Sequence, residues 1–151
     1  SSSLVGSEMC IRDSLYTDPH DAARTVLAEG LIRLGVISQS LDEALDPETG
    51  DLRKWYMHNT SHWIGLDVHD AGVYKPGGTP RVLEPGMCLT IEPGLYFGAW
   101  RPDVDCPERY ANIGIRIEDD VLITTDGPVV LTADCPKSID DIENIVGQDL
   151  A

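Results

Sequence analysis

The strictest pattern in this sequence is the alternation of apolar and polar residues over Ile113–Glu118. Three isoleucines alternate with a glycine and two charged residues (Ile113, Ile115 and Ile117 against Gly114, Arg116 and Glu118). Successive side chains of a β-strand point to opposite faces, so the pattern predicts a strand whose isoleucine face is buried in a core. The other face then carries Arg116 and Glu118. A single glutamate on such a face is usually a solvated residue, so this position needs support from other parts of the chain.

A second predicted strand, Met87–Glu92, ends directly before a Pro93-Gly94 turn. If it is a neighbour of Ile113–Glu118 in one sheet, the carboxylates of Glu92 and Glu118 can meet. Val121–Thr124 is predicted to form a further strand after a turn at Asp119-Asp120. The second half of the chain is therefore expected to be mostly β.

Three of the four histidines, His58, His62 and His69, lie within a twelve-residue stretch. The stretch contains no HExxH motif, because Asn59, Thr60 and Ser61 are poor helix formers and no glutamate follows His58. A zincin mechanism is excluded on that ground. Each histidine alone is more often a hydrogen-bonded structural residue than a ligand. Together with glutamates on strand faces, they support the hypothesis of a metal site.

The first half of the chain has helical signals. Asp18 is predicted to cap a helix that begins with Pro19 and stops at Gly35, with apolar residues at helical spacing between them. A shorter helix is expected at Leu41–Leu45, followed by a loop over residues 46–51.

The sequence predicts different structures for the two ends of the chain. Ser138 is expected to cap a short C-terminal helix whose apolar residues face inward (Ile139, Ile142, Ile145 and Val146). Residues 1–14 have no periodicity and are predicted to be a non-native or disordered arm outside the fold. No internal repeat or long linker divides the rest of the chain.

Charge excludes several kinds of partner. The 151 residues contain 11 Lys+Arg and 26 Asp+Glu, a formal net charge of −15. Binding to nucleic acid or to an anionic membrane surface requires a basic face, so neither is expected. No apolar run approaches the roughly 20 residues needed to span a bilayer, and no export signal precedes the fold. A cytoplasmic location with reduced cysteines is the resulting expectation.

Three blocks of sequence, in this order, resemble the Xaa-Pro aminopeptidase (aminopeptidase P) family: HNTSHWIGLDVHDAG, RVLEPGMCLTIEPGLYF and IGIRIEDDVLIT. The family belongs to the pita-bread metallopeptidases. The resemblance implies an α+β pita-bread (creatinase/aminopeptidase-like) fold, C-terminal portion only, with a curved antiparallel sheet and flanking helices. Residues 15–151 would then be a partial catalytic domain.

The resemblance also implies roles for individual residues. His62, Glu92 and Glu118 would be metal ligands, with Glu118 bridging two metals and Glu92 also acting as a catalytic base. His58 and His69 would be catalytic residues that line the substrate site, and Arg116 would bind substrate or support the site from its strand face.

The implied chemistry uses two metal ions that activate a water molecule as a hydroxide nucleophile. Carboxylates with a single imidazole suit Mn²⁺ better than metals that prefer soft ligands. The substrate would be a proline-containing peptide, and the whole enzyme would be a homo-oligomer.

The family's site has two further ligands, a pair of aspartates upstream of the helix predicted to begin near Asp18. No aspartate pair before His58 has the family's spacing, and Asp13 and Asp18 are the nearest candidates. We therefore expect a truncated fragment that binds one Mn²⁺ or none and is inactive, or nearly so, by itself.

Three other interpretations stay open. A prolidase, which cleaves Xaa-Pro dipeptides, has the same metal site. A non-catalytic pita-bread binding module shares the fold, although such modules usually lose the His and Glu positions. An acidic α+β domain with structural histidines would bind no metal.

Overall fold

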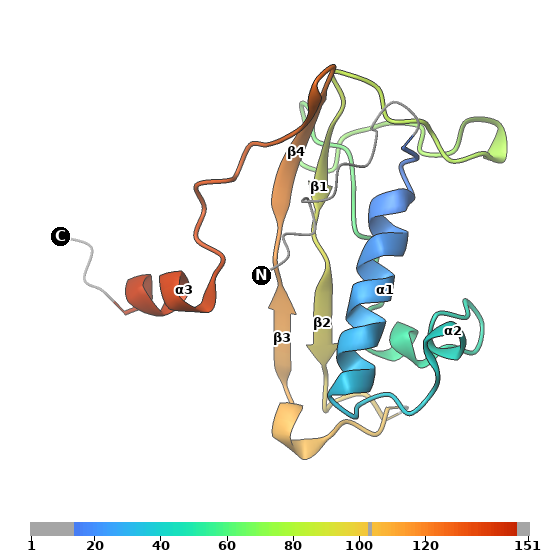
Figure 1. Ribbon diagram of the computed structural model, residues 1–151, viewed down its shortest axis with the longest axis vertical. Coiled ribbons are helices and arrows are strands. Elements are labelled where there is room, and N and C mark those ends of the chain that lie inside the picture. Colours follow the sequence, from blue (N-terminus) through green and yellow to red (C-terminus); the bar gives the residue numbers. More distant parts are fainter. Residues whose placement is uncertain (1–13, 103, 148–151) are drawn as a thin grey trace.

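The computed structural model describes residues 14–102 and 104–147. It contains three α-helices, α1, α2 and α3, and five strands, β1 to β5, within those ranges (Figure 1). The predicted N-terminal arm lies outside the described residues except for Ser14, so its nature stays a prediction. None of the described helices combines the length and apolarity that crossing a bilayer requires.

Helix α1, Asp18–Arg33, fills the predicted position but begins differently. Thr17 occupies the N-cap, and Asp18 lies one residue inside the helix, where its Oδ2 accepts the backbone N–H of Leu15 at 2.8 Å. The capping role predicted for Asp18 is therefore wrong, because its carboxylate closes the preceding turn instead. Leu34 caps the other end, and Gly35 follows with a φ of +70°.

The predicted second helix forms as α2, Leu41–Ala44. Ser40 and Glu43 make a reciprocal capping box, which explains why so short a helix holds its place. Helix α2 and the 3₁₀ helix Asp51–Lys54 pack against α1. One hydrophobic core joins these helices to the end of the second strand through buried residues that include Leu31, Leu52, Trp55 and Phe97.

The strands form a three-stranded sheet, in the order β1-β4-β5, and a two-stranded sheet of β2 and β3. The pairs β1-β4 and β2-β3 lie end to end and make one long ribbon (Figure 1). Strand β1, Cys88–Ile91, pairs antiparallel with β4, Asp119–Thr124, and β2, Gly94–Phe97, pairs antiparallel with β3, Ile113–Arg116. Strand β5, Gly127–Val130, adds to β4. The two glutamate-bearing strands are not paired with each other, because β1 pairs with β4 and β3 pairs with β2. Glu92 and Glu118 instead meet where the two strand pairs adjoin.

The ribbon changes from one ladder to the other at Glu92-Pro93 on one side and at Ile117-Glu118 on the other. The register is the same on both sides of this break, so Glu92 lies opposite Glu118. The predicted turn at Asp119-Asp120 is wrong, because both residues belong to β4 and pair with β1. Thr132 holds both residues: its hydroxyl donates to Asp119 Oδ1 at 2.6 Å and accepts the backbone N–H of Asp120 at 3.1 Å.

The isoleucine face of β3 is not a core. Ile113, Ile115 and Ile117 are 42%, 60% and 47% exposed. The alternation predicts the strand correctly, but among the described residues nothing packs on this face, so the predicted burial is wrong. The pattern indicates a face suited to burial without supplying the partner that would bury it.

Helix α3, Ile139–Ile145, also has exposed apolar side chains. Ser138 caps it as predicted, but Ile139, Ile142 and Ile145 are 75%, 43% and 50% exposed, and Val146 is exposed as well. The prediction that they face inward is wrong, because α3 lies apart from the strands (Figure 1). The segment before it is tied to β4 by an ion pair between Lys137 and Asp119.

Candidate metal centre

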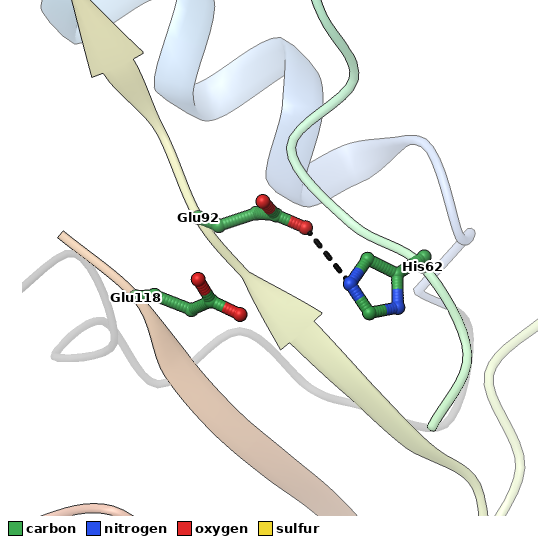
Figure 2. Close-up of side chains that lie close together, drawn as sticks. All are labelled: His62, Glu92 and Glu118. Carbon is green, nitrogen blue, oxygen red and sulfur yellow. Dashed lines mark ion pairs between the residues drawn. The ribbon is translucent and has the colours of Figure 1, made fainter. Parts of the chain in front are cut away.

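Three separate segments bring His62, Glu92 and Glu118 together. Each side chain offers a ligand atom, and these atoms all lie within 4.8 Å of one another. His62 comes from the segment before β1, Glu92 follows β1, and Glu118 precedes β4 (Figure 2). Because Glu92 and Glu118 are opposite each other in the register, their carboxylates lie on the same face, beside the imidazole.

Thr90 positions two of these ligands. The backbone N–H of His62 donates to Thr90 Oγ1 at 3.0 Å, and the Thr90 hydroxyl donates to Glu92 Oε1 at 2.9 Å. Backbone hydrogen bonds from Thr90 to the His62 carbonyl and from Glu92 to the Thr60 carbonyl join the two segments. Because Thr90 is fully buried, this arrangement is shielded from competition by water.

The ring of His62 is oriented for a cation. Its Nδ1 lies 3.0 Å from the Trp63 carbonyl oxygen, so Nδ1–H donates there and Nε2 is left as an acceptor. Nε2 lies 3.2 Å from Glu92 Oε1, which is also an acceptor. Two facing acceptors repel each other unless a proton or a metal cation lies between them. Ligand atoms about 3 Å apart suit adjacent positions around a small divalent ion.

Arg116 links the metal group to His58. Its Nη1 lies 3.2 Å from Glu92 Oε2, and its Nε–H donates to the Tyr96 hydroxyl at 2.7 Å. The Tyr96 hydroxyl lies 3.0 Å from Nε2 of His58, whose Nδ1 faces the Asn59 carbonyl oxygen. Tyr96 therefore donates to His58. The hydrogen bond to Tyr96 raises the pKa of Arg116, which keeps a positive charge beside Glu92.

A pocket of about 770 Å³ opens at this group. Its lining includes His58, His62, His69, Glu92 and Arg116. The exposed His69 ring packs edge-on against the His62 ring at a centroid separation of 4.3 Å. The structure thus brings all predicted site residues to one place, with Glu118 beside the pocket lining as the third member of the metal group. Their catalytic and binding roles stay predictions.

Comparison with known proteins identifies the protein family. The model of metallopeptidase family M24 matches residues 5–125 of the chain. The chain belongs to metallopeptidase family M24. Xaa-Pro aminopeptidase of Escherichia coli is 46% identical over 121 residues, which is 80% of this chain and 26% of that protein. Xaa-Pro aminopeptidase 1 of Streptomyces coelicolor is 45% identical over 129 residues, 85% of this chain and 26% of that protein.

Solved structures of aminopeptidases agree in fold. The structure of Pseudomonas aeruginosa aminopeptidase PepP matches with a TM-score of 0.78 at 42% identity, covering 86% of this chain and 28% of that one. Aminopeptidase P from E. coli with the inhibitor Pro-Leu matches with a TM-score of 0.73 at 44% identity, covering 87% and 28%. The pita-bread fold implied by the sequence blocks is confirmed. The chain spans about a quarter of the length of these relatives.

Sequence reasoning missed Thr90 and Tyr96 in this M24 site. Thr90 lies two residues before Glu92 in the predicted strand Met87–Glu92, so strand alternation places both side chains on the same face and could have indicated Thr90. Tyr96 lies beyond the break in the ribbon, and no local pattern relates it to Arg116. Their contacts depend on the strand register, which the sequence alone does not supply.

Proposed function

We propose that this chain supplies the His and Glu ligands of the metal centre in a Xaa-Pro aminopeptidase that releases the N-terminal residue from Xaa-Pro peptides. The convergence of His62, Glu92 and Glu118 from three segments is the observation that carries the proposal. When bound, the metal would polarise the scissile carbonyl and lower the pKa of a coordinated water. His62 would hold the ion through Nε2, and the two carboxylates through their oxygens.

Manganese is the proposed ion. Two hard carboxylates and one imidazole form a donor set typical of Mn²⁺ among the first-row metals. The charge of two carboxylates balances one divalent ion, whereas a second ion would leave the group positive next to Arg116. We therefore propose that the chain by itself holds a single ion, and that a complete dinuclear centre needs further carboxylates.

The residues around the metal group suit a peptide substrate. Arg116 lines the pocket and the exposed His69 ring lies beside the metal ligand His62, where each can donate to a carbonyl oxygen. His58 also lines the pocket and is bonded to the Tyr96 hydroxyl that accepts from Arg116. The names of the similar proteins favour an aminopeptidase over a prolidase. The joint presence of all three ligands disfavours a non-catalytic module. A cytoplasmic homo-oligomer completes the proposal.

A chimera tests the function. Residues 15–125 would replace the corresponding segment of E. coli Xaa-Pro aminopeptidase, with which the chain shares 46% identity over 121 residues. We expect manganese-dependent cleavage of Xaa-Pro peptides, abolished by Glu92→Gln. A chimera that melts cooperatively and binds manganese but cleaves no Xaa-Pro peptide would contradict the proposal. The isolated 151-residue chain is expected to show little or no cleavage.

A further inference from the structure

The fourth histidine, His20, belongs to the same pocket although sequence reasoning gave it no role. It lies in the first turn of α1, far from the other histidines in sequence, and lines the pocket of about 770 Å³ together with His62, Glu92 and Arg116. Its ring is partly buried and packs against the ring of Tyr56 at a centroid separation of 5.6 Å. The ring position is thus fixed by packing as well as by hydrogen bonds.

A chain of hydrogen bonds holds one side of this imidazole. His20 Nδ1 lies 2.9 Å from Thr60 Oγ1, and the Thr60 hydroxyl is also bonded to the Tyr56 hydroxyl. Thr60 is fully buried and Tyr56 is 5% exposed. Buried hydroxyl hydrogens need acceptors, so the role of Nδ1 in this group of hydrogen bonds can be deduced.

Every arrangement that gives both hydroxyl hydrogens an acceptor uses Nδ1 of His20 as an acceptor. Either Tyr56 donates to Thr60 and Thr60 donates to Nδ1, or Thr60 donates to Tyr56, whose hydroxyl lies 3.5 Å from Nδ1 and donates there. With a hydrogen on Nδ1, one of the two hydroxyl hydrogens would have no acceptor among the described residues. Burial raises the pKa of Tyr56, so its hydroxyl stays protonated and able to donate. Nδ1 of His20 is therefore an acceptor.

The other ring nitrogen is then a hydrogen-bond donor. A neutral imidazole with an unprotonated Nδ1 carries its hydrogen on Nε2. Burial, followed by the nearby Arg24, lowers the pKa of His20, so the ring is neutral near pH 7. Within residues 14–102 and 104–147, no hydrogen-bond partner of Nε2 is present. A partner from a bound molecule would satisfy it.

We propose that His20 is a substrate-binding residue whose Nε2–H donates to an oxygen of the peptide bound in this pocket. The proposal rests on the proposed peptidase function, and adds a contact from α1 to those from His58, His69 and Arg116. The acceptor is a peptide carbonyl or a C-terminal carboxylate, which share the same hydrogen-bonding chemistry. Tyr56 and Thr60 act as positioning residues that fix the tautomer.

Two substitutions separate binding from support of the fold. The amide of His20→Asn reaches the position of Nδ1 and can keep the bond to Thr60, but it does not reach the position of Nε2. The amide nitrogen of His20→Gln reaches the position of Nε2. We would titrate the manganese-loaded chain with the dipeptide Pro-Leu and measure Kd by isothermal titration calorimetry.

The expected result is a roughly 10-fold weaker Kd for His20→Asn and a change within about 2-fold for His20→Gln. If His20 only supports the fold through Thr60, His20→Gln should weaken binding more than His20→Asn. That order, or equal affinities in all three proteins, would overturn the proposal. So would a wild-type chain that does not bind Pro-Leu at millimolar concentration. Pro-Leu amide identifies the acceptor: a loss confined to the free acid indicates a carboxylate, and a loss with both peptides indicates a carbonyl.

Two further readouts keep the proposals distinguishable. The ¹⁵N shifts of the His20 ring in the metal-free chain should show the Nε2–H tautomer, and the Nδ1–H tautomer would overturn the proposal directly. Manganese content, measured on the loaded samples of the titration, should be equal in wild type and both variants. A chain that lacks manganese contradicts the proposed function, while the tautomer and the peptide titration without metal still test His20.

Discussion

The two glutamates of the metal centre lie opposite each other in one ribbon, yet their surroundings differ completely. Glu92 is 7% exposed, and it contacts His62, Thr90 and Arg116. Glu118 is exposed and follows β3, whose isoleucine face is uncovered among the described residues. One half of the site is therefore built from a packed region, and the other half from a strand that lacks a cover.

The difference between Glu92 and Glu118 shows which part of the metal centre this chain holds rigidly by its own contacts. The position of Glu92 is enforced by hydrogen bonds that water cannot easily replace, whereas Glu118 is held chiefly by the strand register. A metal ion should thus depend more on the packed side than on the uncovered side. The same contrast runs through the fold, since the core around α1 is closed while β3 and α3 expose their apolar residues.

The largest effect should come from the closed core. Leu31 is fully buried in that core, and Leu31→Ala should lower the free energy of unfolding by about 3 kcal/mol through lost burial and a cavity. The matched substitution Ile115→Ala on the uncovered face should cost less than about 0.5 kcal/mol. Urea denaturation measures both. A large cost for Ile115→Ala would mean that β3 is covered in solution.

Removing a carboxylate tests the two halves of the site against each other. Glu92→Gln should weaken manganese binding roughly 100-fold, because it neutralises a desolvated ligand held by neighbours. Glu118→Gln should weaken binding by about 10-fold, because an exposed carboxylate is screened by solvent. Isothermal titration calorimetry gives both constants, with circular dichroism as the control for folding. The reverse order would refute the contrast between the two glutamates.

Thr90→Val tests the support behind the packed side. The substitution keeps the shape of the side chain but removes the hydroxyl that contacts the His62 backbone and Glu92, so manganese affinity should fall about 10-fold. Thr124→Val removes a hydroxyl bonded to the Gly127 carbonyl oxygen, at the other end of β4, and should leave affinity unchanged. Equal affinities in both variants would show that Thr90 does not orient the ligands.

The smallest expected effect is a pH dependence from His20. Burial, followed by the charge of Arg24, lowers the pKa of His20, while Asp21 raises it. The unfolded chain therefore binds the proton more readily, and stability should fall as the pH drops from about 7 to about 5. His20→Gln should reduce this fall. Urea denaturation at both pH values measures it, and an unchanged slope would contradict the lowered pKa.

Much of this architecture could be predicted from local patterns. The caps at Ser40 and Ser138, the helix ending before Gly35 and the two glutamate-bearing strands depend on interactions within a few residues. The three ordered sequence blocks indicated the family, and through it they predicted His62, Glu92 and Glu118 as metal ligands.

What could not be predicted depends on partners distant in sequence. The isoleucines of β3 and α3 have the spacing of buried faces, but burial requires another surface, and none is present among the described residues. Asp18 has the residue type of a cap, yet its carboxylate bonds to Leu15. The tautomer of His20 follows only when Tyr56 and Thr60 are brought beside it.

The most direct test of the metal centre is manganese bound per chain, measured by elemental analysis after loading and desalting, with His62→Ala alongside. Three convergent ligands predict a single ion in the wild-type chain and its loss in His62→Ala. Equal manganese content in the two proteins would contradict the assignment of His62. Two ions per wild-type chain would show that other carboxylates complete a dinuclear centre.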